Sequence, residues 1–159
     1  MKKFVLSACL ASLLTACVST VSDYQSPTTG VNLQLTPQLG GALLAVRRAN
    51  VYIAEEVTTC GFETQGVVRN ADLPRSIAVA PGKTYNLRTV FETVGRQIDG
   101  TVVVDHLFEP KPGASYELRM TSNRDGHIVH LLENGRVLPL RRPCLTNTTS
   151  SYGREQSVK

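Results

Sequence analysis

The sequence predicts an all-β protein, a small antiparallel β-sandwich that contains a hairpin meander. Residues 85–91 alternate between one face with Tyr, Leu, Thr and Phe and another with Asn, Arg and Val, which is the two-residue period of a half-buried strand. Asp-Gly or Asn-Gly pairs, which favour tight hairpin turns, stand at 99–100, 125–126 and 134–135. The chain of 159 residues has 12 Gly, 8 Pro and no Trp, a composition typical of many turns and short strands.

The alternation and the turn signals place each strand in order. We expect strands at 31–35, 50–54, 76–80, 84–92, 101–108, 115–122, 127–133 and 136–140. The glycine dipeptides between the later strands predict three successive hairpins. Residues 36–49 leave two alternatives open, because Thr36-Pro37 is a typical helix start while a strand from Leu43 to Ala54 fits equally well.

One motif occurs twice. The residues Pro, Gly, Tyr, Leu and Arg of segment 81–88 recur at the same spacing in segment 112–119. Each copy fits a type II turn, with Pro and Gly at its centre, that leads into a strand. We interpret the repeat as one local structure used twice; the alternative is a duplicated binding ridge built from Arg88 and Arg119.

The N-terminus carries a targeting pattern. A basic start, Met1-Lys2-Lys3, precedes an apolar stretch from Phe4 to Leu14 that is too short for a permanent membrane span and is typical of an export signal. The next residues, Leu14-Thr15-Ala16-Cys17, resemble the lipobox of bacterial lipoproteins, where one apolar and two small residues precede the cysteine that receives lipid. The alternatives are an ordinary cleaved signal peptide with a chance cysteine, or an uncleaved N-terminal helix.

The resemblance implies a lipid modification and a cellular location. Residues 1–16 would be a lipoprotein signal peptide, and Cys17 would carry a diacylglyceryl thioether and fatty acyl chains such as palmitate. Two or three chains hold a protein at a membrane almost irreversibly. Val18 follows where an Asp would favour retention in the inner membrane. We therefore expect an outer-membrane lipoprotein of a Gram-negative cell envelope, with its domain facing the periplasm; the alternative is a domain exposed at the cell surface.

Removal of the signal peptide changes charge and cysteine content. Loss of Lys2 and Lys3 lowers 17 basic side chains to 15 against 13 acidic ones, so the formal charge falls from +4 to +2. No basic stripe interleaved with aromatic residues remains, which speaks against nucleic acid as a partner. With Cys9 removed and Cys17 modified, Cys60 and Cys144 are left, and in an oxidising compartment such a pair usually forms a disulfide. The alternatives are two reactive thiols or half of a metal site.

Composition divides the mature chain into three parts. We expect a flexible polar tether at 17–30, a β-sandwich domain at 31–145 and a disordered tail at 146–159. The domain loosely resembles the immunoglobulin-like and transthyretin-like sandwiches of small envelope lipoproteins. That resemblance implies a fold, and such folds host many unrelated activities.

Candidate catalytic and metal-binding residues are few. His127 and His130 are three apart, so on a strand they point to opposite faces and cannot share a metal, and His106 falls on a predicted core face. No nucleophile, phosphate-loop or zinc-protease motif occurs, so we expect no enzyme, no metal and no cofactor. The sequence favours a non-catalytic binding or assembly module with an envelope protein as partner. The alternatives are a periplasmic inhibitor or small-ligand carrier, or an envelope enzyme.

Overall fold

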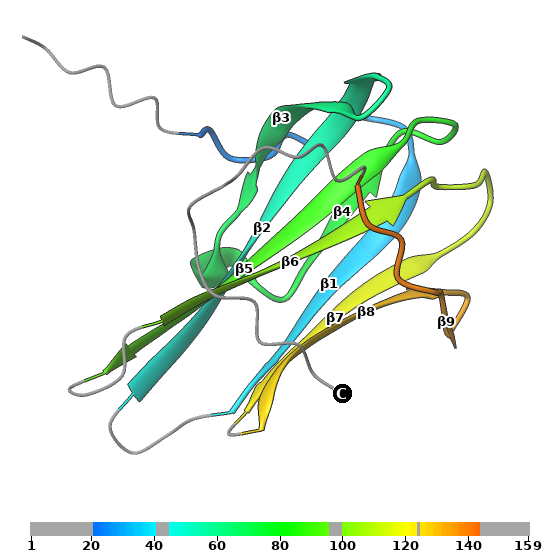
Figure 1. The fold of residues 1–159 in the computed structure, drawn as a ribbon. Helices are drawn as coiled ribbons and strands as arrows, with labels where there is room; N and C mark the ends of the chain where they lie inside the picture. The colour runs from blue at the N-terminus through cyan, green and yellow to red at the C-terminus, as the bar shows by residue number, and fades with distance from the viewer. Residues whose placement is uncertain (1–20, 41–44, 96–99, 124, 144–159) are drawn as a thin grey trace, which may run out of the picture.

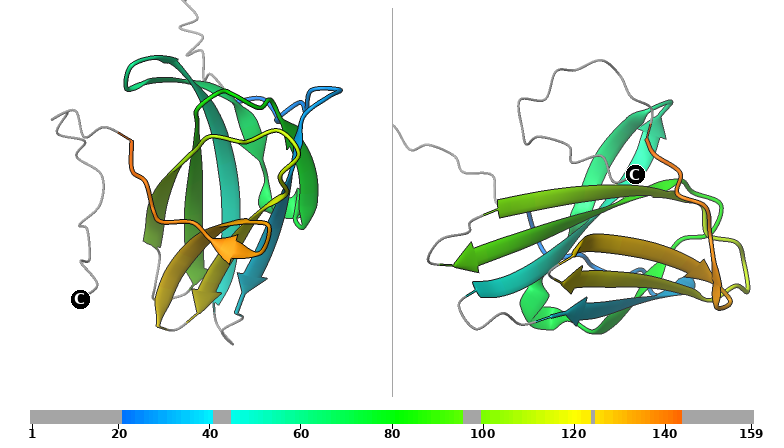
Figure 2. Two further views of the ribbon diagram at one scale, coloured as in Figure 1. Left: turned by 90° about the vertical axis from the view of Figure 1, so that its right-hand side faces the viewer. Right: turned by 60° about the horizontal axis from the view of Figure 1, so that its bottom comes forward.

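The computed structural model describes residues 21–40, 45–95, 100–123 and 125–143, and these form two β-sheets packed face to face (Figures 1 and 2). Sheet A has four strands in the order β3, β2, β5, β6, and sheet B has five in the order β4, β1, β7, β8, β9. The bounds in sheet A are β2 (Ala45–Thr58), β3 (Gly61–Val68), β5 (Tyr85–Gly95) and β6 (Gly100–Phe108). Those in sheet B are β1 (Val31–Leu39), β4 (Arg75–Val79), β7 (Tyr116–Asn123), β8 (Gly126–Glu133) and β9 (Arg136–Val137). The predicted all-β sandwich is confirmed.

The core lies between the two sheets, where the inward side chains of every second residue meet. Burying each large apolar side chain stabilises the fold by about 1.5 to 3 kcal/mol. The largest side chains buried completely or almost completely are Phe91, Phe108, Leu33, Leu35, Ile53, Leu87, Leu118, Met120 and Leu131. The same alternation leaves the polar residues of each strand on the two outer faces.

The structure confirms most predicted strands and corrects the connection between them. Strands β5, β6, β7 and β8 begin and end within three residues of the predicted bounds, but β9 covers only 136–137 of the expected 136–140. The meander is divided: β5 and β6 form a hairpin in sheet A, and β7, β8 and β9 form a meander in sheet B. The chain crosses from one sheet to the other between Phe108 and Tyr116.

The ambiguous segment 36–49 contains strand and no helix in its described part. Strand β1 continues through Pro37 to Leu39, and β2 begins at Ala45. Proline lacks the N–H that a central strand position requires. It is tolerated here because β4 pairs with β1 only as far as Leu35, so Pro37 has a single neighbouring strand, β7.

The N-terminal segment 21–26 is docked on the sandwich, which corrects the boundary of the expected tether at 17–30. Backbone hydrogen bonds join Val67 to Ser22 (3.0 Å) and Tyr24 to Val67 (2.9 Å), so the segment lies along the outer edge of β3. The Tyr24 side chain is 5% exposed. Its hydroxyl and that of Ser26 both bond the backbone of Ala78 in β4. The folded domain therefore begins by Val21, ten residues before the predicted start.

The repeated motif has the same structure in both copies. Gly82 and Gly113 each have φ of 74°, and the tyrosine three residues later is buried in each case. The hydroxyl of Tyr85 accepts a hydrogen bond from the Ala80 N–H (3.2 Å), as Tyr116 does from the N–H of Lys111 (3.1 Å). One local structure is thus used at the start of β5 and again at the start of β7.

The alternative interpretation of the repeat, a duplicated binding ridge built from Arg88 and Arg119, is wrong. Arg88 lies on the outer face of sheet A, where it pairs with Asp105 at 2.8 Å, and Arg119 lies on the outer face of sheet B, where it pairs with Glu117 at 2.9 Å. The two arginines therefore face opposite sides of the molecule.

Candidate functional site

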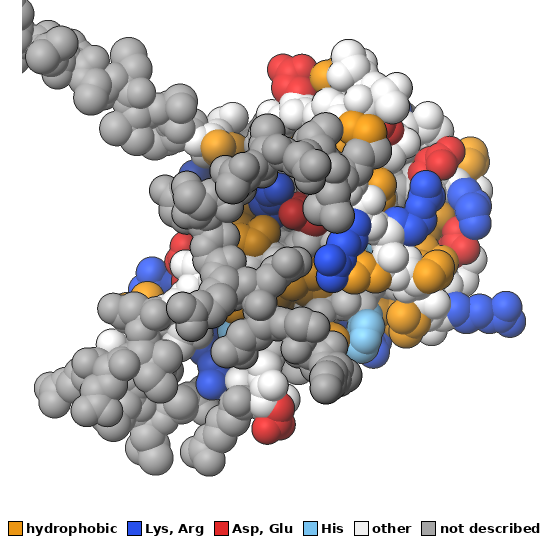
Figure 3. Space-filling model, viewed as in Figure 1, with side chains coloured by type: hydrophobic (Ala, Val, Ile, Leu, Met, Phe, Trp, Pro, Cys, Tyr) orange, Lys and Arg blue, Asp and Glu red, His pale blue; other side chains and the backbone are white. Residues whose placement is uncertain are grey.

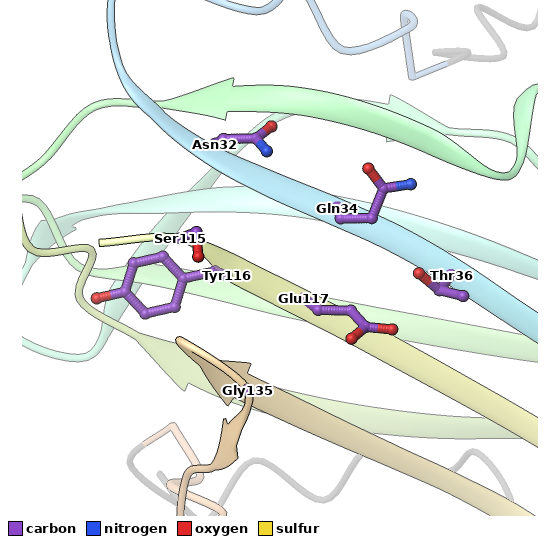
Figure 4. A pocket seen from close by; sticks show the side chains of 7 residues that line it. All are labelled: Asn32, Gln34, Thr36, Ser115, Tyr116, Glu117 and Gly135. Carbon is purple, nitrogen blue, oxygen red and sulfur yellow. The ribbon is translucent and has the colours of Figure 1, made fainter. Parts of the chain in front are cut away.

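A polar hollow lies on the outer face of sheet B, over β1 and β7 (Figure 4). Its volume is about 430 Å³, and it opens widely to solvent. Strand β1 supplies every second side chain to it, because the intervening residues are buried in the core. The lining residues are Asn32, Gln34, Thr36, Ser115, Tyr116, Glu117 and Gly135.

The side chains around the hollow are tied to neighbouring elements. Gln34 accepts a hydrogen bond from the Ser76 hydroxyl of β4. The Asn134 side chain, in the turn between β8 and β9, accepts hydrogen bonds from the N–H (3.1 Å) and hydroxyl (3.2 Å) of Ser115. Tyr116 donates to Glu133 at 2.7 Å. Such a site offers amide and hydroxyl groups in fixed positions, which suits hydrogen bonding to a small polar molecule.

The carboxylate of the hollow stays ionised. Arg119 donates two hydrogen bonds to Glu117, of 2.9 and 3.2 Å, and together with a bond from Thr36 these lower the pKa of the Glu117 carboxyl. A carboxylic acid that protonates a substrate near neutral pH needs a raised pKa instead. Glu117 is therefore suited to accept hydrogen bonds rather than to donate a proton.

The three histidines take the positions that the strand period predicts. His106 is 2% exposed on the core face of β6, and burial lowers its pKa, with a further contribution from nearby His130. His127 lies against Phe91, with ring centres 4.8 Å apart, while His130 is exposed on the other face of β8. In the described part of the chain, no three His, Cys, Asp or Glu side chains gather where they could hold a metal ion.

Of the predicted modification sites, one lies in the described residues. Cys60 is in the turn between β2 and β3, with φ of 65°, and its N–H donates to Glu56 at 3.0 Å. Cys17 and Cys144 lie outside the described residues, as do the predicted signal peptide at 1–16 and the tail at 146–159.

Sequence reasoning missed the surface along β6, the strand at one edge of sheet A. Val102 and Val103 of this strand are 40% and 50% exposed. Figure 3 shows several hydrophobic side chains on the face that Figure 1 presents, interspersed with Lys, Arg and His side chains. An edge strand with exposed apolar side chains can accept another strand through its main chain. The run Val102-Val103-Val104 is the signal that could have identified this surface from the sequence.

No protein-family model, no curated protein sequence and no solved structure matches the chain. Among the described residues there is no helix with the length and apolar character that crossing a membrane requires.

Proposed function

We propose that this protein is a lipid-anchored lipoprotein of the outer membrane, facing the periplasm, that acts without catalysis as a binding or assembly module of the envelope. The single observation that carries the binding role is the exposed apolar edge of β6. The lipobox-like residues Leu14-Thr15-Ala16-Cys17 support the anchor.

The use of the charged groups supports binding rather than catalysis. Five carboxylates of the described residues pair with a basic neighbour at 2.6 to 2.9 Å, so their charges are neutralised locally. These pairs are Asp23 with Arg69, Glu55 with Lys83, Asp105 with Arg88, Glu133 with Lys111, and Glu117 with Arg119. The pKa values of Glu117 and Glu133 are lowered by their hydrogen-bonded partners, whereas acid catalysis near neutral pH needs a raised pKa.

Replacement of Cys17 tests the anchor. The Cys17→Ser chain cannot form a thioether, so we expect it to lose metabolically incorporated palmitate and to leave the membrane fraction after a high-salt wash. Cys9→Ser is the matched control, because that cysteine would leave with the signal peptide; this variant should stay lipidated and membrane-bound. Retention of Cys17→Ser in the washed membranes would contradict the lipoprotein assignment.

The same proposal includes a disulfide between Cys60 and Cys144. The carbonyl of Arg141 accepts a hydrogen bond of 2.7 Å from the N–H of Leu107, which brings the C-terminal segment to the end of β6. That end of β6 pairs with the start of β5, which in turn pairs with β2 close to its turn at Cys60. Closing so long a loop would stabilise the fold by about 4 to 5 kcal/mol in the chain-entropy model.

Peptide mass mapping after alkylation tests the disulfide. In protein isolated from the envelope without reductant, we expect the peptides of Cys60 and Cys144 to be linked and to separate on reduction. Alkylation of both thiols before reduction would remove the disulfide from the proposal.

Crosslinking in intact cells tests the binding role. A photoreactive amino acid at Val103 should give a reproducible crosslinked product, because this side chain lies on the exposed edge. The same group at Val94, which is 52% exposed on the neighbouring strand, is the control. If the group at Val103 yields no product above the level obtained with the group at Val94, the module has no partner at this edge.

The polar hollow favours a second candidate, a small-ligand carrier. Native mass spectrometry of the protein purified from its envelope would detect a co-purifying polar molecule, and Gln34→Leu should reduce its occupancy because the amide is lost. Spectra that show the unliganded mass alone would exclude the carrier.

A further inference from the structure

Three of the four sheet edges carry features that block strand addition. Strand β3 is covered by residues 22–24, and its register against β2 is interrupted twice. On β4 both backbone groups of Ala78 are bonded, the N–H to Ser26 and the carbonyl to Tyr24. Strand β9 is only two residues long. Covering segments, bulges and short strands are the usual protections of an edge.

The fourth edge, β6, carries one such contact, the bond from the Leu107 N–H to Arg141 near the end of the strand, and is otherwise built differently. It is nine residues long and pairs with β5 without interruption from Phe108 to Gly100. It has no Lys, Arg or Pro, and three consecutive valines, 102–104, form its centre. A long, regular and apolar edge is a template for pairing with a further strand.

The direction of its backbone groups follows from one hydrogen bond. The N–H of Leu107 donates to the carbonyl of Arg141, which lies outside sheet A, so Leu107 directs its backbone groups away from β5. These directions alternate along an antiparallel strand. The N–H and C=O groups of Thr101, Val103 and Asp105 therefore point outward as well, and they are the groups that an incoming strand would bond.

We propose that the occupant of this edge is β6 of a second copy of the chain, paired antiparallel about a two-fold axis at Val103. This assignment rests on the proposed role of β6 as the binding edge. In this register Val103 faces Val103 of the second copy and exchanges both backbone hydrogen bonds with it. The pairing joins the two copies of sheet A into one continuous sheet.

The sequence of β6 is self-complementary in this register. Val102 of one copy faces Val104 of the other, and Thr101 faces Asp105, so apolar residues meet at the centre and polar ones at both ends. Asp105 forms an ion pair with Arg88 of its own chain at 2.8 Å, so each copy brings a carboxylate whose charge is already neutralised. An unrelated strand gains the same backbone bonds without this match of side chains.

The interface is small, which sets the expected affinity. Pairing through one strand falls at the low end of protein interfaces, where complexes are weak and transient. We expect a dissociation constant in the micromolar range in solution. Lipid anchoring of both copies to one membrane would favour the dimer by raising their effective concentration.

Sedimentation velocity of the full-length protein in detergent tests the dimer, from about 1 to about 100 µM to bracket a micromolar dissociation constant. The wild type should shift from monomer to dimer as concentration rises. Val103→Lys places like charges opposite one another and should weaken the dimer by about tenfold or more. Val94→Lys, on the same sheet but on the interior strand β5, should dimerise as the wild type does.

A cysteine at the axis tests the register. Hydrogen-bonded residues of antiparallel strands have Cα atoms about 5.5 Å apart, within the range of a disulfide. Val103→Cys should therefore form a covalent dimer on mild oxidation, and Val94→Cys should not. Circular dichroism of each variant establishes that it is folded.

The proposal is overturned by a wild type that stays monomeric throughout, by a dimer that persists in Val103→Lys, or by a dimer that Val103→Cys does not trap. Its failure is distinguishable from that of the proposed function. A monomeric protein whose Val103 crosslinks to a different envelope protein would refute self-association and leave the binding module intact.

Discussion

The hydroxyl of Tyr24 donates a hydrogen bond of 2.9 Å to the carbonyl of Ala78, which fastens the N-terminal segment to β4. Burial raises the pKa of Tyr24 to about 12, so this donor keeps its proton at every pH at which the protein is handled. The contact spans two sheets, because the backbone of the same tyrosine is bonded to Val67 of β3.

We predict that Tyr24 is part of the cooperative fold. Tyr24→Phe should lower the free energy of unfolding by about 1 kcal/mol through loss of the hydrogen bond. Tyr24→Ala should lower it by about 3 kcal/mol or more, because a buried aromatic ring is removed. Urea denaturation measures both. Val21→Ala, at a 38% exposed position, is the control and should stay within about 0.5 kcal/mol of the wild type. A Tyr24→Ala chain as stable as the control would show that the segment does not contribute.

The two tyrosines of the repeated motif should differ in their contributions. Tyr85→Phe leaves the N–H of Ala80 without its acceptor, which should lower the free energy of unfolding by about 1 kcal/mol. Tyr116→Phe should lower the free energy of unfolding by a larger amount, because the Tyr116 hydroxyl accepts a hydrogen bond from Lys111 and also donates one to Glu133. Thermal and urea denaturation of the two variants compares them directly, and equal losses would contradict a role for the second bond.

The paired glycines offer a test of backbone strain alone. Gly82 and Gly113 both have φ of 74°, and a methyl group at either would meet no atom within 4 Å. Gly82→Ala and Gly113→Ala should therefore each lower the free energy of unfolding by about 1 kcal/mol through the left-handed backbone. Gly100→Ala has equal space without the positive φ and is the matched control. Equal stability of all three variants in urea would show that the turns relax.

The buried His106 should make the protein less stable in acid. Its pKa is lowered in the fold, chiefly by burial, while the unfolded chain protonates it near the ordinary value of 6.5. As the pH falls below about 6.5, the unfolded state binds the proton first, so stability is lost on acidification and is fully present above that pH. Both ring nitrogens lack a hydrogen-bond partner among the described residues, so the charged form has little to stabilise it.

His106→Leu removes this titration. The free energy of unfolding is measured in urea at pH 8 and at pH 5.5. Its decrease between these pH values should be smaller for the variant than for the wild type. The difference should reach up to about 1.4 kcal/mol for each unit by which the pKa of His106 differs between the folded and the unfolded state. The lowered pKa of His127 leaves a remaining slope in the variant. Parallel pH profiles for the two proteins would remove His106 as the cause.

The strands that could be predicted are those whose own residues alternate with the two-residue period. Strand β7 has buried residues at 116, 118, 120 and 122, so its pattern is readable from the sequence. Strand β3 was missed because Gly61 and Gly66 interrupt its alternation and its register shifts against β2. Residues 21–26 look like a linker because their docking uses backbone bonds and a single buried side chain, neither of which produces a period.

The candidate site was less predictable than the fold. The polar hollow combines residues of β1 with residues of β7 that lie more than 70 positions away, and only the parallel pairing of these strands places them together. The edge position of β6 likewise depends on where the chain changes sheet after Phe108. The hollow leaves no local signal, and the valine run at 102–104 marks an apolar strand without showing that it lies at an edge, whereas the faces of the histidines follow from the strand period alone.

The docked segment 21–26 also limits the distance between the folded domain and the proposed lipid attachment site. On the proposed attachment at Cys17, only residues 18–20 lie between the lipidated residue and the folded body, a leash of at most about 14 Å at full extension. Under that proposal, a domain held so close to the lipid would not explore the depth of the periplasm. It would meet other molecules by lateral diffusion in the plane of the bilayer, where copies anchored in the same way would present β6 at the same distance from the membrane.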